Sequence, residues 1–106
     1  MTDWFLYRLL PPRPDFAFTM DEREAAAMAE HAEYWRGHLA AGRTIFFGPV
    51  GDAAGVWGMA VVRGSSAEEV ARLGEGDPAV RAGVARFDVL QVLAPVTLAD
   101  EGAALP

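Results

Sequence analysis

Two neighbouring apolar runs, residues 43–50 (RTIFFGPV) and 56–63 (VWGMAVVR), most constrain the fold of this chain. Both are rich in β-branched and aromatic residues, which favour strands, and the turn residues GDAAG between them predict a hairpin. An antiparallel sheet with one face in water alternates apolar and polar residues. Here both alternating sets of the second run are apolar or small: Val56, Gly58, Ala60 and Val62 on one side, Trp57, Met59 and Val61 on the other. We therefore expect both faces of the sheet to be covered.

Two further strands and two helices flank this hairpin. Residues 4–10 predict a first strand that ends at the stiff segment PPRP, and residues 84–93 predict the last strand. Between the first strand and the hairpin, Thr19 and Glu22 have the spacing of a capping box, and Gly42 is a helix stop.

The second helix follows the hairpin. Ser65 and Ser66 stand where helix caps are expected, and the helix formers after them run to about Leu73. The order β-α-β-β-α-β predicts an α+β, ferredoxin-like fold, with two helices on one face of a four-stranded antiparallel sheet. Because two helices cover one face only, we expect the other face to pack against a second copy of the chain.

Composition bounds the function classes. The 106 residues suit one domain, which we place at residues 1–95 with a weakly patterned tail at 96–106. The net charge of −6, with dispersed arginines as the basic residues, argues against nucleic-acid binding. No apolar run approaches a membrane span, the N-terminus lacks the features of a signal peptide, and cysteine is absent. We expect a cytoplasmic protein, and the lack of lysine beside abundant Ala, Gly and Arg suggests a GC-rich bacterial genome.

Both histidines lie on the first predicted helix. On a helical wheel the apolar stripe centres on Met28, Ala32, Trp35 and Leu39, which places His31 and His38 at its border. Such histidines most often serve as boundary residues, and His38 could also interact with the helix dipole. Their spacing separates the rings by about 10 Å along the axis, so a shared metal site is not expected.

Chemistry is the sharper interpretation for His31. Imidazole titrates near neutral pH and can act as a general base when an aspartate orients its ring. The lone Asp52 after the first hairpin strand is a candidate partner. The order of residues alone leaves open whether Asp52 lies near His31.

Other residues carry weaker signals. Arg8 among apolar strand residues predicts an ion pair, with an anionic ligand as the alternative. Tyr34 could donate a hydrogen bond to a substrate, and Trp57 could line a pocket or a dimer interface. Asp77 before Pro78 is typical of a helix N-cap, with a catalytic role as the alternative.

Four blocks occur together in order: HAEY at residues 31–34, Gly42, FGPV with Asp52 beyond it, and DPAVRAG at 77–83. Together they resemble the YciI-like (YCII-related) family over residues 4–93. The resemblance implies a dimeric α/β barrel and an active site with a histidine–aspartate pair, carried over here to His31 and Asp52. It also implies proton abstraction or elimination on a small, ring-derived molecule, with no cofactor.

Two hypotheses of function follow. In the first, the chain is a small enzyme with His31 as base, Asp52 as its partner, and Arg8, Tyr34 and Trp57 around an unknown small molecule. In the second, it is a non-catalytic ligand-binding or accessory protein on the same dimeric scaffold. The second predicts that no carboxylate lies within hydrogen-bond distance of the histidine ring.

Overall fold

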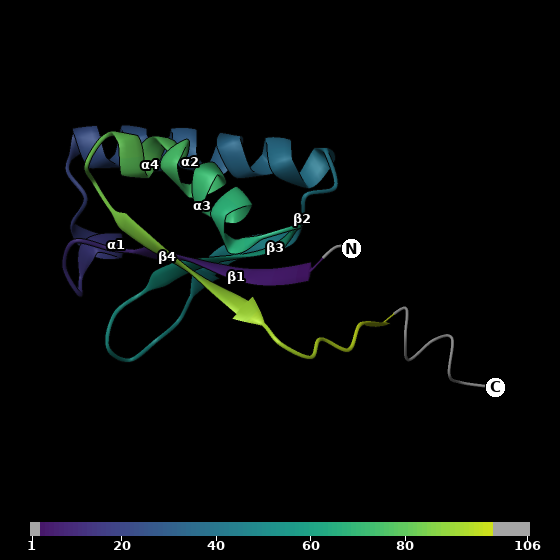
Figure 1. Ribbon diagram of the computed structural model, residues 1–106. Helices are drawn as coiled ribbons and strands as arrows, with labels where there is room; N and C mark the ends of the chain where they lie inside the picture. Colours follow the sequence, from purple (N-terminus) through teal and green to yellow (C-terminus); the bar gives the residue numbers. More distant parts are fainter. Residues whose placement is uncertain (1–2, 99–106) are drawn as a thin grey trace.

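The computed structural model describes residues 3–98 and contains the predicted elements plus two short helices (Figure 1). Their order is β1 (Asp3–Leu10), α1 (Phe16–Thr19), α2 (Glu22–Ala40), β2 (Thr44–Val50), β3 (Trp57–Gly64), α3 (Ala67–Glu75), α4 (Pro78–Arg81) and β4 (Arg86–Val92). Residues 99–106 of the predicted tail lie outside the described part, so the division at residue 95 stays a prediction. None of the helices within residues 3–98 has the length and apolar character needed to span a membrane.

The strands form one antiparallel sheet in the order β2-β3-β1-β4. In Figure 1, α2, α3 and α4 lie together on one side of this sheet. The predicted α+β, ferredoxin-like fold is confirmed. The short helices α1 and α4 add to it: α1 follows the proline-rich segment, and α4 occupies the glycine-rich segment before β4.

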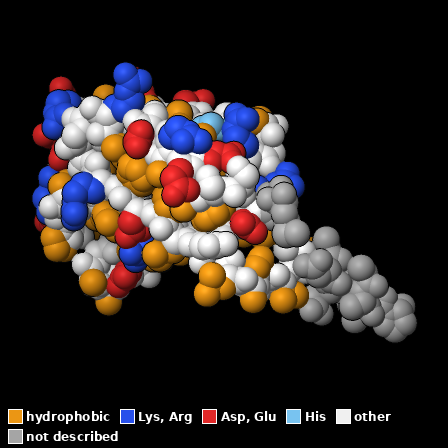
Figure 2. Space-filling view, in the orientation of Figure 1, with side chains coloured by type: hydrophobic (Ala, Val, Ile, Leu, Met, Phe, Trp, Pro, Cys, Tyr) orange, Lys and Arg blue, Asp and Glu red, His pale blue; other side chains and the backbone are white. Residues whose placement is uncertain are grey.

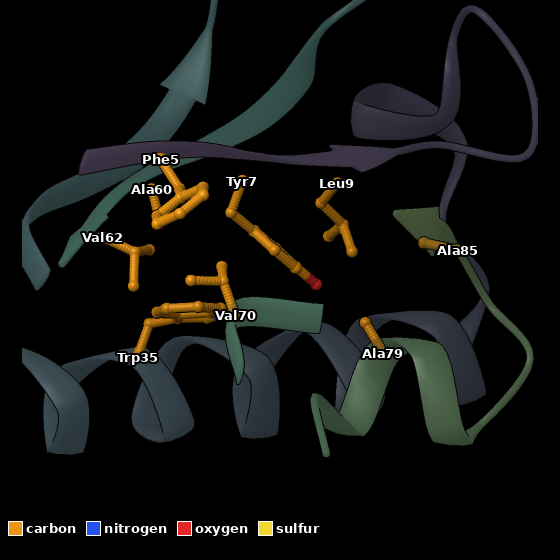
Figure 3. Close-up of a cluster of buried hydrophobic side chains, with 9 residues drawn as sticks. All are labelled: Phe5, Tyr7, Leu9, Trp35, Ala60, Val62, Val70, Ala79 and Ala85. Carbon is orange, nitrogen blue, oxygen red and sulfur yellow. The ribbon is translucent and has the colours of Figure 1, made fainter. Parts of the chain in front are cut away.

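The core lies between the sheet and the helices. Phe5, Tyr7 and Leu9 of β1 alternate with residues of the other face and point toward α2 and α4 (Figure 3). Trp35 of α2 closes this layer from the helix side at 1% exposure, which confirms its predicted place in the core. Its ring centroid lies 4.7 Å from that of Tyr7.

Helix α2 begins later than the sequence pattern predicts. Asp21 is the N-cap and forms a capping box with Glu24, so the expected box of Thr19 with Glu22 is wrong. The reason is that residues up to Thr19 form the separate helix α1. The predicted stop is confirmed, because Gly42 has φ +79°, a left-handed conformation that favours glycine.

The buried side of α2 is rotated from the predicted stripe. Ala27 and Trp35 are buried and His31 is partly buried, whereas Leu39 is 43% exposed. His31 therefore lies within the buried side of the helix rather than at its border. This rotation turns the imidazole toward the interior.

The second face of the sheet, away from the helices, carries the other set of alternating residues of β3, which includes Val61, as the sequence predicted. Leu6 pairs with Val61 and with Leu90 across the two neighbouring strands. Phe46 and Leu90 are 51% and 47% exposed. Figure 2 shows hydrophobic side chains along the lower side of the molecule, below the helices of Figure 1.

Candidate functional site

A pocket of about 260 Å³ opens between α2 and the sheet. His31, Ala32 and Trp35 line it from α2, and Tyr7 and Leu9 line it from β1. Further lining residues come from α1, β2, β3 and the adjoining loops. The wall is almost wholly apolar. Apart from His31, the lining residues include no Asp, Glu, His, Lys or Arg.

The carboxylate of Asp77 contacts the imidazole ring of His31 at Nδ1. Nδ1 of His31 lies 2.8 Å from Oδ2 and 3.0 Å from Oδ1 of Asp77. The side chain of His31 is 14% exposed and that of Asp77 is fully buried. The contact joins residues 46 positions apart in the sequence.

Asp77 receives three further hydrogen bonds. The Tyr7 hydroxyl donates at 2.9 Å, the Trp35 indole N–H at 2.8 Å and the Ala79 backbone N–H at 2.9 Å. The last bond is the helix cap that the sequence predicted, because Asp77 is the N-cap of α4. One buried carboxylate thus both starts a helix and orients the histidine.

These donors set the charge of the site. Burial raises the pKa of Asp77, but the bonds from His31, Trp35 and the Ala79 N–H outweigh it and hold this pKa below its ordinary value. Burial, together with the neighbouring Asp77, raises the pKa of Tyr7, so the phenol stays neutral. Asp77 is therefore ionised at neutral pH and can only accept hydrogen bonds.

The tautomer of His31 follows from this contact. A carboxylate has no proton to give, so Nδ1 carries the hydrogen and the neutral ring presents Nε2 as an acceptor. Within residues 3–98, no protein group forms a hydrogen bond with Nε2 of His31. Every buried side-chain nitrogen or oxygen of these residues has a partner, so Nε2, which has none, is not buried. Because His31 lines the pocket, Nε2 is accessible from it and is suited to take a proton.

Asp52 lies elsewhere. It is exposed in the loop between β2 and β3, where its carboxylate accepts from the Ala54 N–H at 2.9 Å and the Trp57 indole at 3.1 Å. The structure thus pairs His31 with Asp77 in place of the expected Asp52. The hairpin places Asp52 in a second hollow, beside Arg8 and the proline-rich segment.

The residues expected to contact a substrate, Arg8, Tyr34 and Trp57, also form bonds to other protein groups. Arg8 lies on the second face of the sheet and forms an ion pair with Asp88 at 2.6 Å, its neighbour in the strand register. The Tyr34 hydroxyl donates to the Leu73 carbonyl at 2.6 Å, and Tyr34 does not line the pocket. Trp57 does line the pocket, as well as the second hollow.

His38 takes no part in this pocket. It lies in the last turn of α2, and its Nδ1 accepts a hydrogen bond from Arg43 at 2.8 Å. Burial and the Arg43 charge lower the pKa of His38, so the ring is neutral rather than a cation at the helix dipole. Over the described range 3–98, no three His, Cys, Asp or Glu residues gather as metal ligands.

Sequence comparison assigns the family. The model of the YCII-related domain matches residues 5–93, so the chain belongs to the YCII-related family. No curated protein sequence matches this chain significantly.

A solved structure shares the fold. It is the 5-chloro-2-hydroxyhydroquinone dehydrochlorinase of Burkholderia phenoliruptrix AC1100, in complex with 2,5-dihydroxybenzoquinone. The two chains are 18% identical, with a TM-score of 0.61 over 86% of this chain and 95% of the other. This similarity supports the α+β, ferredoxin-like fold of the chain.

Proposed function

We propose that this YCII-related chain is a small-molecule enzyme that uses His31 and Asp77 for general acid–base catalysis. The observation that carries the proposal is the buried Asp77 carboxylate 2.8 Å from Nδ1 of His31, at the wall of an apolar pocket. The non-catalytic hypothesis predicts no carboxylate within reach of this ring. The contact therefore favours the enzyme.

In the proposed reaction, a substrate C–H or O–H group is positioned at Nε2 of His31. Nε2 takes the proton, and the electron pair of the broken bond stays on the substrate or expels a leaving group. Asp77 stabilises the imidazolium that forms, because its carboxylate already lies against Nδ1. The imidazolium then returns the proton to the product or to water.

The structural neighbour suggests where to begin the search for a substrate. Its name describes removal of HCl from a hydroxylated, chlorinated ring, a reaction that requires proton transfer. We propose a small ring compound as substrate here as well, because a pocket of about 260 Å³ has room for little more than one or two rings.

The test is proton transfer itself. Deuterium wash-in from D₂O into cyclic enones and substituted hydroquinones can be followed by NMR, with chloride release measured for 5-chloro-2-hydroxyhydroquinone. We expect His31→Gln to reduce the active reaction by at least about 100-fold, the lower range of a general base. Glu30→Gln, an exposed change on the same helix, is the matched control. Equal rates in the two variants would exclude His31 as the base.

We further propose that the second sheet face binds a second copy of this chain. Its apolar residues span several strands, and its charged pair Arg8–Asp88 is internally neutralised, so the face is suited to contact an identical one. At about 25 cal/mol per Å² of apolar area, covering it is favourable. Leu90→Glu should yield monomers in analytical ultracentrifugation, while Gln91→Glu, on the opposite face of β4, should not.

A further inference from the structure

We infer that the pocket selects uncharged ring compounds carrying one polar group, and that it rejects anions. This inference names the substrate class of the site proposed above and rests on that proposed function. Three observations carry it: apart from His31, the side-chain donors of the lining are already used, no lining residue supplies a permanent positive charge, and Asp77 places a negative charge behind His31.

The polar groups of the wall are few and satisfied. Besides His31, hydrogen-bond donors on the lining side chains belong to Tyr7, Trp35 and Trp57. Tyr7 and Trp35 donate to Asp77, and Trp57 donates to Asp52. A ligand in the pocket therefore meets a single free polar atom of these side chains, Nε2 of His31.

An anionic ligand finds no arginine or lysine in the lining to replace the water that it loses. Arg8 and Arg13 line the second hollow and not this pocket, and both already pair with carboxylates. Burying a carboxylate or phosphate without a partner is strongly unfavourable. The Asp77 charge, fixed on the far side of the His31 ring, adds repulsion.

An uncharged phenol, enol or ketone fits these conditions. Its ring contacts the apolar side chains, and its one oxygen or acidic C–H reaches Nε2 of His31. An engineered apolar cavity of about 150 Å³ binds benzene, so a pocket of about 260 Å³ accommodates a substituted ring. The preference for neutral over anionic ligands is the specificity that this lining produces.

The test uses two ligands of nearly equal shape, acetophenone and benzoate, titrated by calorimetry and NMR at pH 6.5. The first is neutral there and the second carries a carboxylate. We expect the neutral ligand to bind at least about tenfold more tightly to the wild-type chain. Equal affinities, tighter binding of the benzoate, or no saturation by either ligand at millimolar concentration would overturn the inference.

Two variants test where this selection arises. Ala32→Leu adds a larger side chain at the pocket wall and should weaken binding of acetophenone at least about tenfold, whereas Ala29→Leu, on the exposed side of α2, should not. Met20 lines the pocket and is 39% exposed, so an arginine at this position would not bury its charge. Met20→Arg should strengthen benzoate binding and so reduce the difference in affinity between the neutral and the anionic ligand. Unchanged ligand preference in this variant would count against selection by charge.

The outcome is separable from that of the proposed function. Selective binding of the neutral ligand without any proton transfer would leave the charge selection standing and overturn the catalytic proposal. Proton transfer from anionic substrates, with no preference for neutral ones, would support the catalytic proposal and overturn the charge selection.

Discussion

Tyr7 and Asp77 connect the sheet to the candidate site: the hydroxyl on β1 donates to Oδ2 of the fully buried carboxylate at 2.9 Å. The two residues are 70 positions apart in the sequence. Their contact fixes the end of α4 that carries Asp77 against the middle of the sheet. A core residue, Tyr7, therefore helps to fix the position of Asp77, the carboxylate that contacts His31.

The first prediction tests this connection by Tyr7→Phe. The change keeps the ring and removes a donor to an ionised group, which should lower the free energy of unfolding by about 2 kcal/mol. Tyr34→Phe removes a donor to the Leu73 carbonyl, a neutral acceptor, and should cost about 1 kcal/mol. Urea denaturation of the two variants makes the comparison. A larger loss for Tyr34→Phe would contradict the role given to Tyr7.

The second prediction separates the two aspartates. Asp77→Asn allows an amide N–H to face Nδ1 of His31, which favours the tautomer with the proton on Nε2 and removes the base. We expect proton transfer to fall at least about 100-fold in this variant and to change less than about threefold in Asp52→Asn. Deuterium wash-in measures both, and circular dichroism checks that the variants fold. A large loss in Asp52→Asn alone would favour the pairing expected from the sequence.

The sequence predicts the fold well because the signals are local. The apolar, strand-favouring runs of β1 and β3 and the stop at Gly42 depend on neighbouring residues only. The site depends on contacts between distant segments. Asp77 has the sequence context of a helix cap, and it is one; nothing within its neighbourhood indicates that the same carboxylate also meets His31.

The choice of Asp52 shows the same limit. The family resemblance implies Asp52 as the partner, but Asp77 and Asp88 also follow His31 in this chain, and linear order does not decide which carboxylate reaches the ring. Packing decides it, because the rotation of α2 that buries Ala27 and Trp35 also turns His31 toward α4. A hint was present in the DPAVRAG block, whose aspartate begins a helix beside the core.

The third prediction concerns acid stability. Hydrogen bonds from Arg13 and from the Asp21 backbone lower the pKa of Glu24 to about 2. Because the folded-state value lies below the unfolded one, the stabilisation is complete above about pH 4.5 and is lost as the pH falls toward 2. Glu24→Gln should reduce stability at neutral pH and flatten this acid decline. Glu22→Gln, an exposed change in the same turn, is the control. Parallel curves for wild type and Glu24→Gln below pH 4.5 would argue against the ion pair.

The fourth prediction concerns His38, whose pKa is lowered by burial and by Arg43. Protonation is easier in the unfolded chain, so lowering the pH below about 6.5 favours unfolding until the folded-state pKa is passed. His38→Gln keeps an acceptor for Arg43 and has no charge to gain. The variant should therefore lose less stability than the wild type between pH 7 and 5, measured by urea denaturation at each pH. A steeper loss in the variant would mean that His38 is stabilised as a cation at the end of α2, the alternative that its place in the helix left open.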